Sequence, residues 1–233
     1  DNEEIDYLLT ETNKVFPAAQ LTRESVKFTY SGVRPLPYTE SKKPGAVSRN
    51  HILNDHSKDG VTNMVSLIGG KLTTHRRVGE EMVDWVYAHR KQPAPACPTR
   101  QQPLPGAILP TDGRIAQAIA QYADKYADTL SAHTLDHLFQ RYGARTFALL
   151  KLIDESPELA APIVPTLLDI KAQIVFAVRD EMAFNFGDIC RRRTMLSLQA
   201  NYGLDASDAI AQTLQAHCQW SPEKCQKDIA AYK

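Results

Sequence analysis

The sequence predicts a mainly α-helical protein, in which part of an α+β sheet domain is followed by a C-terminal helical bundle. Strand-like segments occur only in the first third of the chain, and every periodic segment after residue 111 has helical spacing. A proline-rich segment between these regions should be extended and semi-rigid. We therefore expect a partial domain over residues 1–91, a linker over residues 92–106 and an α-helical domain over residues 107–233.

The first region should contain two helices and three strands. Apolar residues at helical spacing predict a helix over residues 2–15, which Pro17 ends, and a second helix over residues 76–90. Alternating apolar and polar residues predict one strand, and two short apolar runs predict the others. The expected strands cover residues 26–30, 47–56 and 63–68.

The second region should contain five to seven helices that bury their apolar faces against one another. Gly143 should end the second of them, and Pro165 is placed as a first-turn proline of the fourth. The fifth should include Ile189 and end near Gly203, and a short helix should follow Pro222. Because these contacts are local, we expect the helical domain to fold by itself. The strands of the first region would leave unpaired edges, so in isolation the chain should aggregate, swap strands with a copy of itself or leave residues 1–70 partly disordered.

Composition restricts the possible partners. The formal net charge is zero, so no global basic field favours nucleic acid. Hydrophobic residues make up 43% of the chain, yet no apolar run approaches the roughly 20 residues that span a bilayer. The chain opens at Asp1 with an acidic stretch, without an initiator methionine or a signal peptide. We expect it to be a fragment or a processed chain.

The sequence indicates no metal site. No cysteines form a CxxC pair, so neither a structural zinc site nor a disulfide framework is expected. His133 and His137 are four residues apart on a predicted helix but lack a third ligand, which favours a structural or solvated pair. The four cysteines are Cys97, Cys190, Cys218 and Cys225.

The most informative stretch, residues 69–76, links a predicted strand to a predicted helix. Gly69 and Gly70 allow a ligand to approach the backbone closely, and Lys71 adds a positive charge. The first amides of the helix have no acceptor within it, which makes such a junction a good anion site. Thr73 or Thr74 could cap the helix. The alternative is an ordinary capped strand-to-helix turn.

Three cations lie at the ends of the strand-like segments. If the strands are neighbours, Arg34, Arg49 and Lys71 could converge on one anion, because arginine binds phosphate through a planar fork and lysine supplies a point charge. The alternative is that each is a solvated surface charge. Arg191, Arg192 and Arg193 instead point around a predicted helix, so we expect ion pairs with residues such as Glu181 or Asp188, and solvent exposure.

These motifs resemble the C-terminal part of FAD-dependent glycerol-3-phosphate dehydrogenases. The resemblance rests on residues 31–36, on residues 48–51 and on the glycine-lysine stretch, in this order and spacing. The opening helix is similar to one that precedes the substrate-domain strands of the family, and residues 188–196 resemble an Arg-Arg-Thr box in its C-terminal helical domain. The resemblance therefore covers nearly the whole chain.

The resemblance implies a flavoprotein that oxidises sn-glycerol 3-phosphate to dihydroxyacetone phosphate. FAD would take the hydride, and electrons would pass to quinone. Arg34 and Arg49 would bind the substrate, and Lys71 would be the catalytic residue beside flavin and substrate. The flavin ring would be contacted by Gly69, Gly70, Lys71, Leu72 and Thr73.

The resemblance also has implications for the location of the protein in the cell and for its binding of FAD. We expect a cytoplasmic protein; a homodimer and peripheral contact with the inner face of the membrane stay open. The family's glycine-rich dinucleotide fingerprint is absent from this sequence, so we expect this chain alone to hold no FAD tightly and to be inactive. The alternatives are a glycerol-phosphate oxidase, which reduces oxygen, and a non-catalytic helical interaction module.

Overall fold

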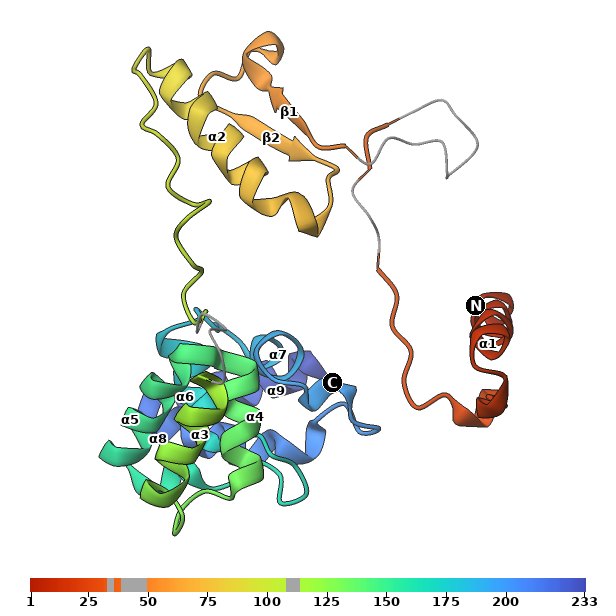
Figure 1. Ribbon diagram of the computed structural model, residues 1–233, viewed down its shortest axis with the longest axis vertical. Coiled ribbons are helices and arrows are strands. Elements are labelled where there is room, and N and C mark those ends of the chain that lie inside the picture. The colour runs from red at the N-terminus through yellow and green to blue at the C-terminus, as the bar shows by residue number, and fades with distance from the viewer. Residues whose placement is uncertain (33–35, 39–49, 108–113) are drawn as a thin grey trace. The chain divides into compact units, whose positions relative to one another are not determined.

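The computed structural model describes residues 1–32, 36–38, 50–107 and 114–233 (Figure 1). It confirms a mainly helical chain with a small two-stranded antiparallel sheet. Contacts divide the chain into one unit of Tyr30–Pro103 and another of Asp1–Thr29 with Leu104–Lys233. The domain boundaries expected from the sequence stay a prediction.

The Tyr30–Pro103 unit is a hairpin with one long helix (Figure 1). Strand β1 (Ile52–Asp55) pairs with β2 (Val65–Ile68), so that Ile52 lies opposite Ile68. Helix α2 (His75–His89) follows β2 and contacts both ends of the hairpin. At one end His51 Nε2 lies 2.5 Å from Glu81 Oε2, and at the other His89 Nε2 lies 2.7 Å from Asn63 Oδ1.

No described residue of this unit is buried, so the unit has no core of its own. Ile52 and Leu67 on the hairpin and Val83 on α2 each keep close to half of their surface exposed. Such an apolar surface is normal for part of a larger domain and unusual for a complete one.

Helix α1 (Asn2–Val15) has the predicted bounds because both its ends are marked in the sequence. The Asp1 side chain accepts from the Glu4 amide at 2.9 Å, which completes a capping box, and Pro17 begins a short 3₁₀ turn. The strand predicted over residues 26–30 is wrong, since these residues belong to no strand. Val26 is extended (φ −71°, ψ 119°), but a strand also requires a neighbouring strand, which local alternation does not reveal.

The helical domain is a group of packed helices (Figure 1). Their buried side chains form two apolar clusters. Gly143 lies directly after α4, as predicted, and Ser221 and Pro222 begin α9, as predicted. The helices are α3 (Arg114–Lys125), α4 (Ala132–Tyr142), α5 (Thr146–Glu155), α6 (Lys171–Arg179), α7 (Phe186–Asp188), α8 (Ser207–Cys218) and α9 (Pro222–Tyr232).

Two helix predictions in this domain are wrong. The fourth helix begins at Lys171 rather than near Pro165, because the Ile163 amide donates to the Asp169 carbonyl at 2.8 Å and closes a loop there. The fifth is not continuous. A single π-helical turn (Ile189–Arg193) follows α7, and Thr194 then adopts an extended backbone (φ −128°, ψ 179°) that ends it.

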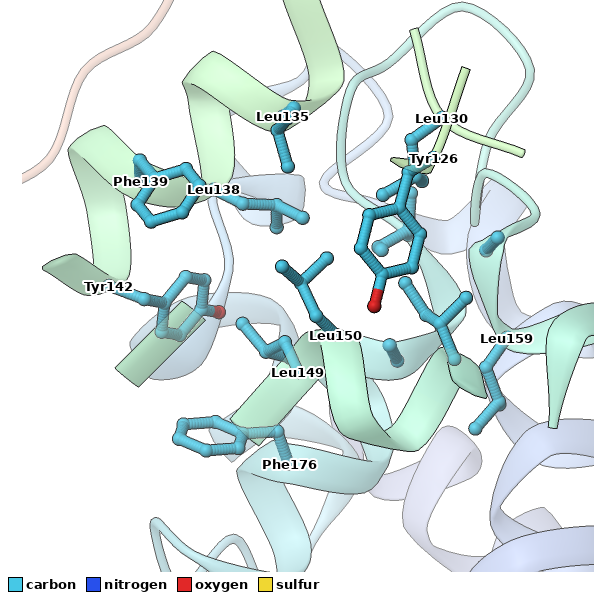
Figure 2. Close-up of a cluster of buried hydrophobic side chains, with 14 of the residues drawn as sticks. Tyr126, Leu130, Leu135, Leu138, Phe139, Tyr142, Leu149, Leu150, Leu159 and Phe176 are labelled. Atoms are coloured by element: carbon cyan, nitrogen blue, oxygen red, sulfur yellow. The ribbon is translucent and has the colours of Figure 1, made fainter. Parts of the chain in front are cut away.

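Helix α6 is the centre of the domain, because residues 172–177 are all buried. A helix that is buried all round needs an apolar layer on each side. Figure 2 shows the first layer, where Phe176 of α6 meets Tyr142 of α4 and Leu149 of α5. Ile174 faces the second layer, which α7, α8 and α9 supply. Buried Gln173 is satisfied by the Ile170 amide at 2.7 Å and by two further polar groups.

Gly143 holds the end of the proline-rich segment against the domain. The Ala144 amide donates to the Gly106 carbonyl at 2.9 Å. Gly143 has φ +53°, and a Cβ there would lie 1.9 Å from that carbonyl oxygen. We expect Gly143→Ala to lower the free energy of unfolding of the helical domain by about 1–3 kcal/mol, because the backbone must move and is also strained. Urea titrations followed by circular dichroism measure this. Gly79→Ala, where a Cβ meets nothing, is the control, and equal stability of both variants would contradict the account.

Asp154 makes the stability of this domain depend on pH. Lys125 Nζ donates to its carboxylate at 2.9 Å and Tyr126 Oη at 2.8 Å. These hydrogen bonds, that from Lys125 first, hold the pKa of Asp154 below its ordinary value of 3.8. A carboxyl whose pKa falls on folding stabilises the folded state above its unfolded pKa, and this contribution is lost as pH falls through the folded pKa.

We therefore expect the free energy of unfolding of the helical domain to fall less steeply in Asp154→Asn than in the wild type between roughly pH 5 and pH 2. Urea titrations at a series of pH values measure this slope. Asp128→Asn, at an exposed carboxylate, should keep the wild-type slope. An unchanged slope in Asp154→Asn would contradict the assignment.

Candidate functional site

The predicted strand-turn-helix junction is confirmed over residues 69–74, which we call the 69–74 turn. Gly69 (φ 71°) and Gly70 (φ 95°) reverse the chain after β2 in a backbone conformation that favours glycine. Lys71 is extended, and a 3₁₀ turn (Leu72–Thr74) then leads directly into α2. The two glycines are therefore required by the backbone itself.

The expected threonine cap is wrong. Thr74 is the residue before α2, but its hydroxyl donates to the Lys71 carbonyl at 2.8 Å instead of accepting from a helix amide. The first internal hydrogen bond runs from the Thr74 amide to the same carbonyl at 3.0 Å. The amides of Leu72 and Thr73 donate to no group in the described part of the chain. Two helix-start donors therefore lack an acceptor among the residues that the structure describes.

The charges around the 69–74 turn differ in how they are neutralised. Arg76 pairs with Glu80 at 3.0 Å and Arg77 with Glu81 at 2.7 Å, both across one turn of α2. Lys71 is exposed and forms no ion pair with any described residue. Its ammonium group is therefore available to a bound anion.

Leu72 adds an apolar surface beside this charge. The residue is 88% exposed, although leucine is among the most frequently buried residue types. The 69–74 turn thus combines two amides that lack an acceptor among the described residues with an exposed lysine and an exposed leucine. This combination suits a flat, partly apolar ring that gains negative charge at one edge.

His51 lies against the 69–74 turn. The sequence did not identify it as a residue of the site. A Cβ at Gly70 would lie 3.2 Å from His51 Cβ, so these two residues approach each other closely. The hydrogen bond from His51, followed by that from Arg77, lowers the pKa of Glu81. Glu81 is therefore ionised near neutral pH, and His51 donates to it through Nε2–H. Thirty residues separate this pair, so no sequence spacing could have indicated it.

Arg76 fastens the proline-rich segment to the start of α2. Its Nη1 donates to Thr99 Oγ1 at 3.2 Å and lies 3.9 Å from Cys97 Sγ. Together with the ion pair to Glu80, these contacts fix the guanidinium group. The contacts of Arg76 therefore give it a structural role.

Arg34 and Arg49 lie outside the described residues, so their convergence with Lys71 stays a prediction. The other residues predicted for the site, Gly69, Gly70, Leu72 and Thr73, lie with Lys71 in one short segment.

The arginine run in the helical domain has the contacts expected of it. Arg192 pairs with Asp188 at 2.8 Å, and Arg193 lies 3.7 Å from Glu181. Arg191 stacks over the Tyr232 ring, with its guanidinium carbon 4.5 Å from the ring centroid. The three side chains diverge, as predicted, and hold the π-helical turn in place.

The residues of the 69–74 turn fit the pyrimidine edge of a flavin. Reduced flavin carries negative charge near N1 and the C2 carbonyl, where two amides and an ammonium group would stabilise it. The fit is limited to this edge, because the sequence has no glycine-rich fingerprint for the dinucleotide.

Neither a metal site nor a membrane span is found in the described part of the chain. Its histidines, cysteines and carboxylates form no group of three that could hold a metal ion. His137 lies 3.3 Å from Asp169 Oδ1. Within the same residues, no helix has the length and apolar character needed to cross a membrane.

Comparisons with known proteins cover both regions of the chain. Residues 97–225, more than half of the chain, match the family described as the C-terminal domain of alpha-glycerophosphate oxidase. A glycerol-3-phosphate dehydrogenase of Synechocystis sp. (strain ATCC 27184 / PCC 6803 / Kazusa) is 56% identical over 232 residues, which are 99% of this chain and 41% of that protein.

Two more distant relatives show the same coverage. A glycerol-3-phosphate dehydrogenase of Mycobacterium leprae (strain TN) is 28% identical over 98% of this chain and 38% of its own length. An aerobic glycerol-3-phosphate dehydrogenase of Escherichia coli (strain K12) is 29% identical over 94% of this chain and 42% of its own length. The chain thus spans about two fifths of the length of the curated relatives it matches.

Proposed function

This chain belongs to the family of the C-terminal domain of alpha-glycerophosphate oxidase, and from this premise we propose that it is part of an FAD-dependent glycerol-3-phosphate dehydrogenase. The whole protein would oxidise sn-glycerol 3-phosphate to dihydroxyacetone phosphate and pass the electrons to quinone. The observation that carries the proposal is the 69–74 turn, where, among the described residues, Lys71 forms no ion pair and the amides of Leu72 and Thr73 have no acceptor.

Each residue of the 69–74 turn has a distinct part in this proposal. FAD, when bound, supplies the hydride acceptor. Lys71 and the amides of Leu72 and Thr73 would stabilise the negative charge that develops at the flavin edge in the transition state. Gly69 and Gly70 would let the ring approach the backbone. Leu72 would cover part of the ring and exclude water.

Arg34 and Arg49 would bind the phosphate of the substrate. This assignment rests on the motif resemblance and on the chemistry of arginine, whose planar fork binds phosphate through paired hydrogen bonds. A substrate held at both its phosphate and its reacting carbon would be oriented towards the flavin.

We also propose that residues 1–91 complete their domain with other parts of a longer protein. The hairpin and α2 have no buried residue, and their apolar side chains are half exposed. A covering layer from elsewhere would bury them and would also supply the dinucleotide cradle that this chain lacks. This chain alone should therefore bind no FAD stoichiometrically and show no activity, which absorbance of the purified chain would test.

The experiment that tests the function is an acceptor comparison on the whole protein. Oxidation of glycerol 3-phosphate is measured with a soluble quinone under nitrogen and then with oxygen alone. Rapid quinone reduction with little hydrogen peroxide supports the dehydrogenase. Comparable rates with stoichiometric peroxide identify an oxidase instead, and no oxidation with either acceptor overturns the proposal.

A further inference from the structure

We infer that His51 and Glu81 form a brace that positions the 69–74 turn for catalysis, an inference that rests on the proposed function. His51 lies one residue before β1, and β1 pairs with β2 so that Ile52 is opposite Ile68. The residue before Ile52 is therefore beside the glycines that follow Ile68. The register of the hairpin is therefore sufficient to place His51 next to the 69–74 turn.

The close approach at Gly70 makes this contact specific. A Cβ at Gly70 would lie 3.2 Å from His51 Cβ, which is tighter than an ordinary contact. His51 thus occupies the space that a Cβ of residue 70 would need.

Glu81 fixes the ring from the other side. His51 Nε2 donates to Glu81 Oε2 at 2.5 Å, and Arg77 Nε donates to Glu81 Oε1 at 2.7 Å. The His51 side chain is 18% exposed and that of Glu81 is 31% exposed, so water competes only in part for this hydrogen bond. The brace therefore joins the start of β1, the 69–74 turn and the second turn of α2.

This arrangement gives the brace a role in the reaction. The Lys71 ammonium group and the two amides must lie where negative charge develops, and a shift of about 1 Å can cost up to about 100-fold in rate. No hydrogen bond among the described residues holds the side chain of Lys71 or of Thr73, so their placement depends on the backbone of the turn. His51 and Glu81 are the side chains that fix that backbone against the sheet and the helix. They are positioning residues.

The hairpin provides a matched control in His56. This second histidine also contacts a carboxylate, Asp59 Oδ2 at 2.9 Å, and a hydroxyl, Ser66 Oγ at 2.8 Å. It lies at the opposite end of the hairpin, beside β1 and away from the glycines. If histidine contacts only stabilise the hairpin, His56→Ala and His51→Ala should act alike.

The test uses the whole protein and two readouts. Hydrogen exchange of the amides of residues 69–74 is measured before and after flavin loading, and kcat and KM are measured with glycerol 3-phosphate. His51→Ala should speed exchange in the turn by about tenfold and lower kcat by roughly 10- to 100-fold, with KM and flavin content nearly unchanged. His56→Ala should change neither readout by more than about threefold.

Variants of Glu81 separate the brace from a loss of folding. Glu81→Ala places a good helix former on α2, so the helix is kept and the effect should equal that of His51→Ala. Glu81→Gln keeps an acceptor for His51 and should recover most of the activity. The double variant His51→Ala, Glu81→Ala should be no worse than either single variant, because both remove the same contact.

Two results would overturn the inference. One is exchange in the turn that is equal in His51→Ala and His56→Ala. The other is faster exchange with unchanged kcat, because the brace would then be structural only. Failure of the wild-type protein to oxidise glycerol 3-phosphate would overturn the proposed function and, with it, the catalytic part of the brace.

Discussion

Lys71→Ala in the whole protein is expected to lower kcat/KM for glycerol 3-phosphate by about 100- to 1000-fold, the loss that follows removal of one preorganised charge-stabilising donor. Lys71 is exposed and unpaired among the described residues, so its removal breaks no ion pair. Its position after the two glycines puts its charge at the edge of the 69–74 turn. The effect should therefore appear in the reaction and not in stability. Steady-state kinetics and flavin absorbance measure both.

Lys58→Ala is the matched control, because Lys58 is an exposed lysine of the same hairpin with no ion pair among the described residues. It should keep wild-type activity. Sulfite titration of the oxidised flavin adds a readout without turnover. Sulfite adds a negative charge to the ring, so Lys71→Ala should weaken its binding while Lys58→Ala should not. Unchanged kinetics in Lys71→Ala would show that Lys71 is a surface charge.

Phe176→Ala is expected to destabilise the helical domain by about 3–5 kcal/mol, as large-to-small changes of a buried phenylalanine do. Phe176 is fully buried in the first apolar cluster (Figure 2). Its ring meets Tyr142 edge-on at 5.5 Å between centroids, and the Arg145 guanidinium carbon lies 4.6 Å from it. The cavity left by alanine would thus remove apolar contacts and leave Arg145 without its ring.

Phe184→Ala provides the comparison, since that ring is 67% exposed. It should cost less than about 1 kcal/mol, because little surface is removed from water. The free energy of unfolding is measured by urea titration followed at the helical circular dichroism signal. Equal losses for the two variants would contradict the position of Phe176 in the core.

The parts of the fold that the sequence predicted are those that local chemistry determines. Helix α1 begins at a capping box and stops before Pro17, and both signals lie within the segment itself. The same is true of the glycine turn before α2 and of Ser221 and Pro222 at α9. Hydrophobic spacing needs no knowledge of distant residues.

The predictions that were wrong concern segments whose structure depends on distant residues or on competition between local contacts. Residues 26–30 have an alternating pattern but form no strand, and Pro165 lies in a loop that a backbone contact at Ile163 closes. The Thr74 hydroxyl could either accept from a helix amide or donate to a nearby carbonyl. It donates to the Lys71 carbonyl, so it does not cap the start of α2. His51 lies beside the 69–74 turn because β1 pairs with β2.

The most direct test of the central claim is anaerobic mixing of the whole protein with sn-glycerol 3-phosphate while flavin absorbance is followed. If the 69–74 turn lies at the flavin of a glycerol-3-phosphate dehydrogenase, the yellow absorbance is lost rapidly in the wild-type protein and at least about 100-fold more slowly in Lys71→Ala. Loss of the absorbance at the same rate in both proteins would contradict the assignment of the turn. Absence of any bleaching in the wild-type protein would contradict the proposed function.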